Sequence, residues 1–331
     1  MERKKAPDAG QNEARLWNVV MLDEIRFSVV SSEARRERPG FLMVRLAPQQ
    51  SISLGAIRIT YLPDGEFSIP PAVLYPQASA EHWSAYAHLI GKDGRLISNV
   101  GAHVIQTDAQ TLLVDAGVGP RAVNIDELQA SLHGGELLQS LKRAGLSPDD
   151  IDTVFYTHLH PDHVGWTGHT VNGKHALTFP RARYVVRREE WLKFEHPAES
   201  RAGIEEALDV LSSRIEWLED GQALAPDVLV QATPGHTPGH SSLVITSSGR
   251  KVVLLGDVFH NVIGIDHPEW IDVLDENANQ AVQTRQRLHQ ELAQPATMGS
   301  GIHLWPSAFG RLVPGAHGAW AWQANADEAS T

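Results

Sequence analysis

THLHPDHVGW, residues 157–166, is the most informative stretch of this 331-residue chain. It follows the short apolar run TVFY, residues 153–156, whose composition is typical of a buried strand. In an extended segment, side chains two residues apart point the same way, so His158 and His160 can converge on one ion. Neutral imidazole is a ligand for zinc and similar divalent metals. The stretch therefore predicts a metal-binding loop at the end of a strand.

A second pair of side chains in the same loop, Asp162 and His163, follows Pro161, where the backbone turns. This pair can face a second ion beside the first. A solvated histidine-rich loop is the plainer alternative, and a single histidine would favour it. Three histidines and one aspartate within six residues favour metal instead, because short histidine-rich tracts usually signal metal binding.

Composition excludes several other kinds of site. The chain contains no cysteine, so disulfides, thiolate metal sites and cysteine nucleophiles are excluded, and any metal must be held by histidine and carboxylate. The formal net charge of −12 opposes binding to nucleic-acid phosphates. No apolar run reaches about 18 residues, the length needed to span a membrane. We expect a small-molecule substrate, no nucleic-acid or membrane partner and a cytoplasmic location, and we leave a homodimer open.

Two parts of the chain differ in character. Residues 1–50 are charged and weakly periodic, and we interpret them as an N-terminal arm that is extended or partly disordered. Residues 51–325 alternate between strand-like and helix-like segments, which predicts one mixed α/β domain built on sheets. Within it, residues 56–61 predict a strand that ends at the turn signal Pro63-Asp64-Gly65. Further predicted elements are a hairpin at 100–105 and 111–114, strands at 179–186, 228–232, 242–246 and 251–255, and helices at 135–144, 189–194 and 277–292.

Three later segments carry further metal-ligand side chains. TPGHTPGH, residues 233–240, presents His236 and His240 after a predicted strand. LLGDVFH, residues 254–260, places Asp257 at a strand tip, where the functional groups of α/β folds usually lie. GIHLWP, residues 301–306, sets His303 between apolar residues. Alone, each segment is a weak signal, because a lone histidine is more often a core residue and a strand-end aspartate a helix cap. Together they supply enough ligands for two ions.

The order of these motifs resembles the metallo-β-lactamase-fold hydrolases. HxHxDH, a PGHTPGH loop, a GD pair at a strand end and a final histidine follow one another between about residues 56 and 322. The resemblance implies a four-layer αββα sandwich with two divalent metal ions, expected to be zinc, at one edge between the sheets. The implied ligands are His158, His160 and His236 for one metal, Asp162, His163 and His303 for the other, and Asp257 as the bridge between them. Supporting contacts to these ligands are implied for Asp115 in LLVDAG, for His240 and for His260.

Further segments resemble one branch of this superfamily, which contains methyl parathion hydrolase and quorum-quenching lactonases. They are Phe179-Pro180, Glu190-Trp191, the stretch from Asp257 through HPEW at 267–270 to Arg285, and HLWP at 303–306. The last segment departs from the branch pattern at Leu304 and Trp305. The resemblance therefore implies a hydrolase of this branch.

The implied chemistry is hydrolysis. Two divalent ions lower the pKa of a bridging water to about 7, and the resulting hydroxide attacks an electrophilic carbon or phosphorus. Asp162 is the predicted catalytic residue, because it can orient this water and pass its proton to the leaving group. Trp166 and Trp305 are predicted to wall the substrate pocket, with core packing as the alternative. We predict a hydrolase of lactones or carboxylic esters; the alternatives are a phosphotriester (organophosphate) hydrolase, a glyoxalase II-type thioesterase and a β-lactamase.

Overall fold

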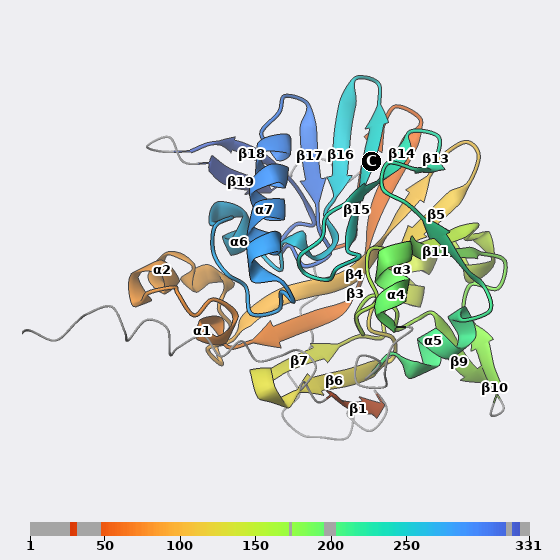
Figure 1. The fold of residues 1–331 in the computed structure, drawn as a ribbon, viewed down its shortest axis with the longest axis horizontal. Helices are drawn as coiled ribbons and strands as arrows, with labels where there is room; N and C mark the ends of the chain where they lie inside the picture. The colour runs from red at the N-terminus through yellow and green to blue at the C-terminus, as the bar shows by residue number, and fades with distance from the viewer. Residues whose placement is uncertain (1–26, 32–47, 172–173, 195–202, 316–319, 325–331) are drawn as a thin grey trace, which may run out of the picture.

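Two sheets packed face to face between helices form the architecture of the computed structural model, which describes residues 27–31, 48–171, 174–194, 203–315 and 320–324 (Figure 1). Among these residues, the first sheet has ten strands in the order β1-β6-β7-β3-β4-β5-β8-β11-β12, with β2 paired to β3. Its strands are β1 (Phe27–Ser31), β2 (Gln50–Leu54), β3 (Ile57–Ile69), β4 (Leu96–Gln106), β5 (Thr111–Val114), β6 (Arg121–Ile125), β7 (Ala130–His133), β8 (Thr153–Tyr156), β11 (Arg183–Arg187) and β12 (Ile215–Leu218).

The second sheet has seven strands among the described residues, and they follow one another in sequence order. They are β13 (Ala223–Ala225), β14 (Val228–Ala232), β15 (Ser241–Ser247), β16 (Arg250–Leu254), β17 (Thr297–Ser300), β18 (Phe309–Pro314) and β19 (Trp320–Ala324). A separate ribbon pairs β9 (Gly168–Val171) with β10 (Lys174–Leu177). The helices are α1 (Pro71–Leu74), α2 (Ala80–Ala85), α3 (Leu137–Arg143), α4 (Arg188–Phe194), α5 (Glu205–Leu211), α6 (Val262–Asp266) and α7 (Ala278–Leu292).

Strand β8 shows how the layers are held together. Successive side chains of a strand point to opposite faces, and all of β8 is buried, so both faces of the first sheet are covered here. Phe155 enters the core between the sheets, where it joins Val230 and Leu243 of the second sheet. Val154 and Tyr156 point outward into the cluster that contains the apolar residues of α3 and α5. Together with helix α7 on the outer face of the second sheet, these contacts confirm the expected four-layer αββα arrangement.

Helix α7 covers the second sheet. Its buried Leu288 and Leu292 pack with Val253 and Leu255, which point outward from the sheet. Figure 1 shows α7, in blue, lying against β17 and β18. Asn277 begins the helix, because its side chain accepts a hydrogen bond from Gln280 N.

The strand ends that carry the metal motifs gather at one edge of the sandwich. Strands β5, β8 and β11 run parallel to one another in the first sheet, and β16 and β17 run parallel in the second. Parallel strands present their carboxyl ends at the same edge, where ligands of α/β folds bind. The loops after β5, β8, β14, β16 and β17 all leave from such ends, and they carry every predicted ligand.

Most predicted elements are present within a few residues of their expected bounds, but two expectations were wrong. Residues 63–65 are not a turn: β3 continues through them to Ile69, and its register with β4 shifts between Pro63 and Gly65. Proline and glycine occur in β-bulges as well as in turns, so the local composition does not separate the two. The strand expected from residue 179 begins only at Arg183, because Ala182 N bonds to Phe179 O in a turn.

The predicted N-terminal arm, residues 1–50, lies mostly outside the described residues. Within it, β1 forms a strand that pairs antiparallel with β6 at the edge of the first sheet. Gln50 already belongs to β2 of the sandwich. The division at residue 50 stays a prediction. Every helix that the structure describes is too short or too polar to span a bilayer.

Candidate metal centre

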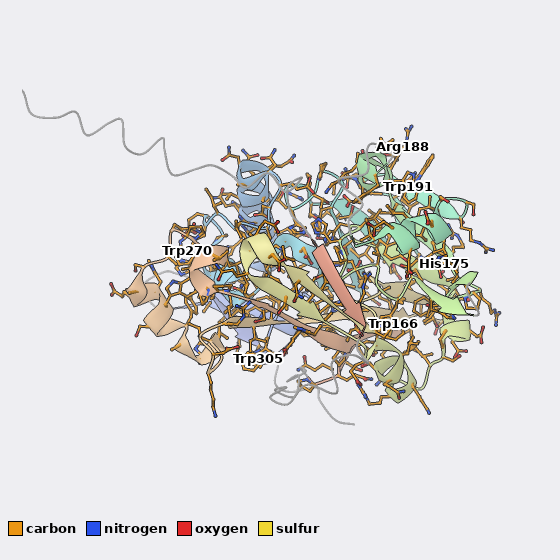
Figure 2. All side chains as sticks on the ribbon, turned by 90° about the horizontal axis from the view of Figure 1, so that it is seen from below. Trp166, His175, Arg188, Trp191, Trp270 and Trp305 are labelled. Carbon is orange, nitrogen blue, oxygen red and sulfur yellow. The ribbon has the colours of Figure 1, made fainter. Side chains whose placement is uncertain are left out.

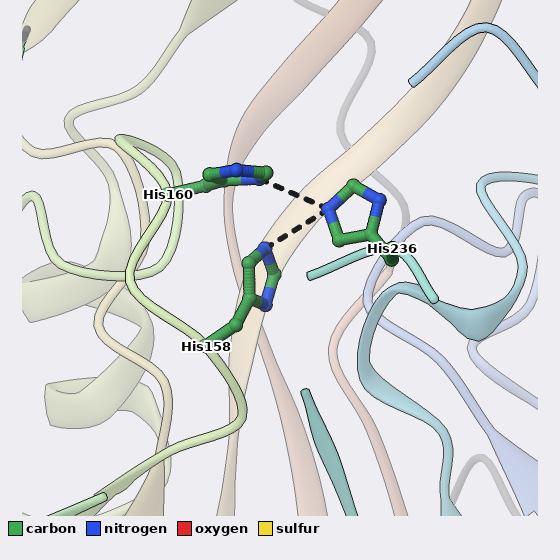
Figure 3. Close-up of side chains that lie close together, drawn as sticks. All are labelled: His158, His160 and His236. Carbon is green, nitrogen blue, oxygen red and sulfur yellow. Dashed lines mark hydrogen bonds between the residues drawn. The ribbon is translucent and has the colours of Figure 1, made fainter. Parts of the chain in front are cut away.

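Three imidazoles form the first group of metal-ligand side chains. His158 and His160 come from the loop after β8, and His236 comes from the loop after β14 (Figure 3). His236 Nε2 lies 3.2 Å from His158 Nε2 and 2.9 Å from His160 Nδ1. Zinc–nitrogen bonds of about 2.0–2.1 Å in a tetrahedral site place two ligand nitrogens roughly 3.3 Å apart. The observed separations are close to this value, so the three rings fit one ion.

Two carboxylates and two imidazoles form the second group, which is Asp162, His163, Asp257 and His303. Asp257 is at its centre: Oδ1 lies 3.1 Å from His163 Nε2, and Oδ2 lies 3.1 Å from His303 Nε2. Asp162 Oδ2 lies 3.5 Å from His303 Nε2. Asp257 Oδ2 also lies 3.6 Å from His236 Nε2, in the first group. Asp257 therefore contacts both groups.

In the second group, neutral imidazole nitrogens face carboxylate oxygens, so that both atoms of each pair carry lone pairs. His303 Nδ1 lies 2.6 Å from the carbonyl oxygen of Asn99, so Nδ1 carries the proton and Nε2 presents a lone pair to Asp257. His163 Nδ1 lies 3.0 Å from Asp115 and so carries a proton, and in the neutral ring Nε2 then presents a lone pair to Asp257. His163 Nε2 and Asp257 Oδ1 are buried and have no hydrogen-bond partner among the described residues. A cation between these atoms, or an extra proton, is needed, and the donor set suits a divalent metal.

The electrostatics of the two groups differ. Burial, together with the charge of neighbouring imidazoles, holds the pKa of His158 and of His236 well below the usual value, so both rings are neutral. Burial would also lower the pKa of His163, but the nearby carboxylates, above all Asp257, raise it well above the usual value. Burial would raise the pKa of Asp257, but the imidazoles around it hold that pKa well below its usual range.

A comparison with known families agrees with this geometry. A family model described as the metallo-beta-lactamase superfamily matches residues 98–296, more than half of the chain. The chain belongs to this superfamily. Its fold, two mixed sheets with flanking helices, is the metallo-β-lactamase fold, as the resemblance implied. The buried His/Asp cluster lies where the motifs of the superfamily predicted it.

Curated relatives in this superfamily include lactonases. An N-acyl homoserine lactonase from Bacillus thuringiensis is 30% identical over 174 residues, which cover 49% of this chain and 64% of that protein. Metallo-beta-lactamase domain-containing protein 1 from Xenopus laevis is 32% identical over 163 residues, which cover 49% of this chain and 58% of that protein. The matches thus span less than two thirds of the length of these relatives.

Solved structures of the superfamily superpose over most of the chain. AidC, a dizinc quorum-quenching lactonase in complex with a product, has a TM-score of 0.72 at 24% identity and covers 85% of this chain and 98% of its own. The hydrolase AbOPH has a TM-score of 0.70 at 24% identity, with the same coverage of both chains. These similarities show a shared fold.

Two of the predicted supporting residues form hydrogen bonds with the loops that carry the His/Asp cluster. Asp115 accepts a bond of 2.8 Å from Thr157 N and lies 3.0 Å from His163 Nδ1. His240 Nε2 accepts a bond of 2.9 Å from Asp257 N, while Nδ1 donates to Thr233 O at 3.1 Å. Both ring nitrogens of His240 are therefore used by the backbone, and the ring orients Asp257.

His260, also predicted to support the ligands, lies closer to the cluster than the other two. Its Nδ1 donates to Asp272 Oδ2 at 2.9 Å, and its Nε2 lies 3.3 Å from Asp257 Oδ2. Burial would lower the pKa of His260, but Asp272 and Asp257 raise it well above the usual value. With His236 and Asp257 it forms a third set of potential ligand atoms within 4.8 Å of one another. Its imidazole thus faces the carboxylate of Asp257 directly.

Asp64 is an organising residue that the sequence analysis missed. It lies on the bulge of β3, is 1% exposed, and accepts hydrogen bonds from the backbone of two loops. The donors are Val118 N, Gly119 N, Gly135 N, Glu136 N and Leu137 N. Burial raises the pKa of Asp64, against these hydrogen bonds, which lower it. Only its place in a Pro-Asp-Gly triplet marked it, and that triplet was interpreted as a turn.

The two tryptophans predicted to wall the pocket lie in different parts of the molecule (Figure 2). Trp166 Nε1 donates to Asp64 Oδ1 at 2.9 Å, and its ring packs against the outer core of the first sheet. Trp305 is half-buried and packs against the core between the sheets and against the cluster that contains Trp270. Their contact with a substrate stays a prediction.

Proposed function

We propose that this protein is a binuclear metal-dependent hydrolase that opens lactones or cleaves carboxylic esters. The observation that carries the proposal is the pair of buried His/Asp groups that share Asp257. His158, His160 and His236 would hold one ion, Asp162, His163 and His303 the other, and Asp257 both. Two bound divalent ions, with zinc the best suited to this donor set, would lower the pKa of a water to about 7 and so supply a nucleophile at neutral pH.

Asp162 is the residue best placed to move a proton. Its side chain is 11% exposed, whereas those of His163, Asp257 and His303 are 0%, 4% and 2% exposed. In lactone hydrolysis, the water oxygen bonds to the carbonyl carbon and the ring C–O bond breaks. The proton of the water would pass through the Asp162 carboxylate to the departing alkoxide, as general acid–base catalysis requires. Asp162 thus serves as both ligand and proton carrier.

A lactone is preferred over a phosphotriester as the substrate for two reasons. An alkoxide is a poor leaving group and needs the proton from Asp162, whereas an activated phosphotriester loses a phenolate that scarcely needs it. The similarity to N-acyl homoserine lactonases, which covers about half of the chain, points in the same direction. The apolar surroundings of Trp305 suit an acyl substituent.

The test is a substrate panel on one preparation of zinc-loaded protein. It would measure kcat/KM for an acyl homoserine lactone, an aryl ester, a phosphotriester, a thioester and a β-lactam. We expect the lactone or the aryl ester to lead. If lactone and ester turnover were at background while the phosphotriester, thioester or β-lactam was hydrolysed well, the proposed substrate would be wrong. The proposed metal centre would still stand. Turnover of the whole panel that does not depend on metal would refute the proposal itself.

A further inference from the structure

A buried carboxylate from α4, Glu190, joins the two loops that carry the first group of imidazoles. Its side chain is fully buried at 0% exposure. Oε1 accepts a hydrogen bond of 3.0 Å from Leu159 N, in the loop after β8. Oε2 accepts bonds of 2.6 Å from Thr237 Oγ1 and 3.2 Å from Gly239 N, in the loop after β14. One carboxylate therefore receives three donors from two loops.

The partners of Glu190 are next to the ligands in sequence. Leu159 stands between His158 and His160, and Thr237 directly follows His236. A shift of either loop at these points would move the ring nitrogens that lie 2.9 and 3.2 Å apart in the first group. The loops are also joined by a backbone bond from Ser241 N to Thr157 O, which involves no ligand residue.

The second loop is packed directly against the backbone of α4 at this point. A Cβ placed on Gly239 would lie 2.0 Å from Glu190 N and 2.3 Å from its Cα. Only glycine permits this approach, which brings Gly239 N within reach of the carboxylate. Helix α4 follows β11, whose parallel neighbour β8 leads into the other loop. The fold thus places Glu190 between both loops.

We propose that Glu190 is a positioning residue that holds His158, His160 and His236 at the separation an ion requires. This inference rests on the metal centre of the proposed function and not on its substrate. Asp115 has the corresponding position under the second group, because it bonds to Thr157 and His163. Glu190 therefore sets the affinity of the first group for metal and leaves that of the second unchanged.

Zinc titration of the metal-free full chain against a chromophoric chelator tests the inference. Glu190→Gln keeps the size of the side chain but sets an amide N–H against Gly239 N–H or Leu159 N–H. Loss of a residue that orients metal ligands typically weakens metal affinity about 10–100-fold. We expect a loss of this size for one of the two ions. The matched control is Glu189→Gln, the neighbouring residue of α4, whose exposed carboxylate pairs with the buried Arg187 and, in the part of the chain that the structure describes, bonds to neither ligand loop.

Two single-site backgrounds show which ion is affected. His303→Ala leaves the first group intact, and there Glu190→Gln should weaken zinc binding by the full factor. His236→Ala leaves only the second group, and there Glu190→Gln should change nothing. Non-additivity of this kind is expected only for residues that act on a common site. Equal weakening in both backgrounds would show a general structural role and overturn the inference, as would unchanged affinity in both.

A folding defect in the variant, and a failure of the proposed function, can both be distinguished from a failure of this inference. If Glu190→Gln does not fold, as judged by thermal unfolding of the metal-free chain, Thr237→Val and Thr237→Ser take its place. The valine removes one hydrogen bond to Glu190, and the serine retains it, so only the valine variant should lose affinity. Wild-type protein that binds no zinc would refute the metal centre and this inference together. Wild-type protein that binds two ions and hydrolyses no lactone would leave the inference standing.

Discussion

The two groups of the metal centre are built on different physical principles. The first is made of neutral imidazoles from two loops, and nothing in their charges draws them together. The second contains two carboxylates, and the attraction between Asp257 and His163 brings its members together even without metal. The first group therefore depends on contacts from outside, such as those of Glu190, whereas in the second group the attraction between its own charged side chains adds to such contacts.

The largest effect is expected where the two groups meet. Asp257→Ala removes the carboxylate that lies beside imidazoles of both groups, so both ions should be lost. Elemental analysis after growth with added zinc should fall from two ions per chain to fewer than one, and hydrolysis should fall to background. Asp257→Asn, which keeps one oxygen, is the milder control. Two ions retained in the alanine variant would show that the groups are independent.

Breaking each group separately should remove one ion. His236→Ala removes an imidazole that belongs to the first group, and His303→Ala removes one from the second. Each variant should retain one zinc ion and lose most of its activity, because the proposed reaction needs both ions. Loss of both ions from either variant would mean that the second ion binds only after the first.

The ligand loops could be predicted from the sequence because their signals are local. The loop after β8 carries four potential ligand side chains within six residues. The motifs PGHTPGH and GD mark the loops after β14 and β16 as further places for metal ligands. Each loop follows an apolar strand, and parallel strands place their carboxyl ends together. The clustering of these loops and a mixed α/β domain could therefore be predicted from the residues, whereas the four-layer fold followed from the resemblance of the motif order to the metallo-β-lactamase-fold hydrolases.

The residues that hold these loops could not be predicted in the same way. Asp64 accepts hydrogen bonds from donors 54 to 102 residues away, and those of Glu190 come from 31 to 49 residues away. No local pattern records such pairings. Asp64 also lies in a Pro-Asp-Gly triplet that suits a turn and a bulge equally well. Glu190 was marked by the resemblance of Glu190-Trp191 to a branch segment, but that resemblance does not indicate its hydrogen-bond partners.

A more selective change separates metal ligation from proton transfer at Asp162, in the second group. Asp162→Asn keeps the shape of the side chain and one donor oxygen but cannot carry a proton. Turnover of a lactone should fall by roughly 10²–10⁴-fold, the usual contribution of an acid–base group. Metal content must be measured on the same sample, because only a variant with two ions isolates proton transfer. Wild-type kcat in that variant would assign Asp162 to ligation alone.

The two groups should also respond differently to pH. Asp257 and its neighbouring carboxylates raise the pKa of His163 well above its usual value of 6.5, so over a pH range around that usual value the metal-free ring is protonated and an ion must displace that proton. His158 and His236 have lowered pKa values and are already neutral over that range. Zinc affinity of the His236→Ala variant should therefore fall about tenfold for each unit of falling pH, while that of His303→Ala stays nearly flat. If chelator titrations gave both variants the same slope of zinc affinity against pH, the two groups would not differ in proton displacement.

The smallest effects are expected at the two tryptophans that follow second-group residues in the sequence, Trp166 after His163 and Trp305 after His303. Burial of roughly 40 Å² of apolar surface contributes about 1 kcal/mol, so Trp305→Ala should raise KM about fivefold for a lactone with a long acyl chain and less for a short one.

Trp166 also donates a hydrogen bond to Asp64. Trp166→Phe keeps a ring but loses that bond, so it should lower the free energy of unfolding by about 1 kcal/mol and leave KM unchanged. Trp166→Ala should change both quantities if its ring also walls the pocket. Measuring KM for two chain lengths, together with denaturant unfolding, separates the roles; a Trp305→Ala variant with wild-type KM for both lactones would assign that ring to the core.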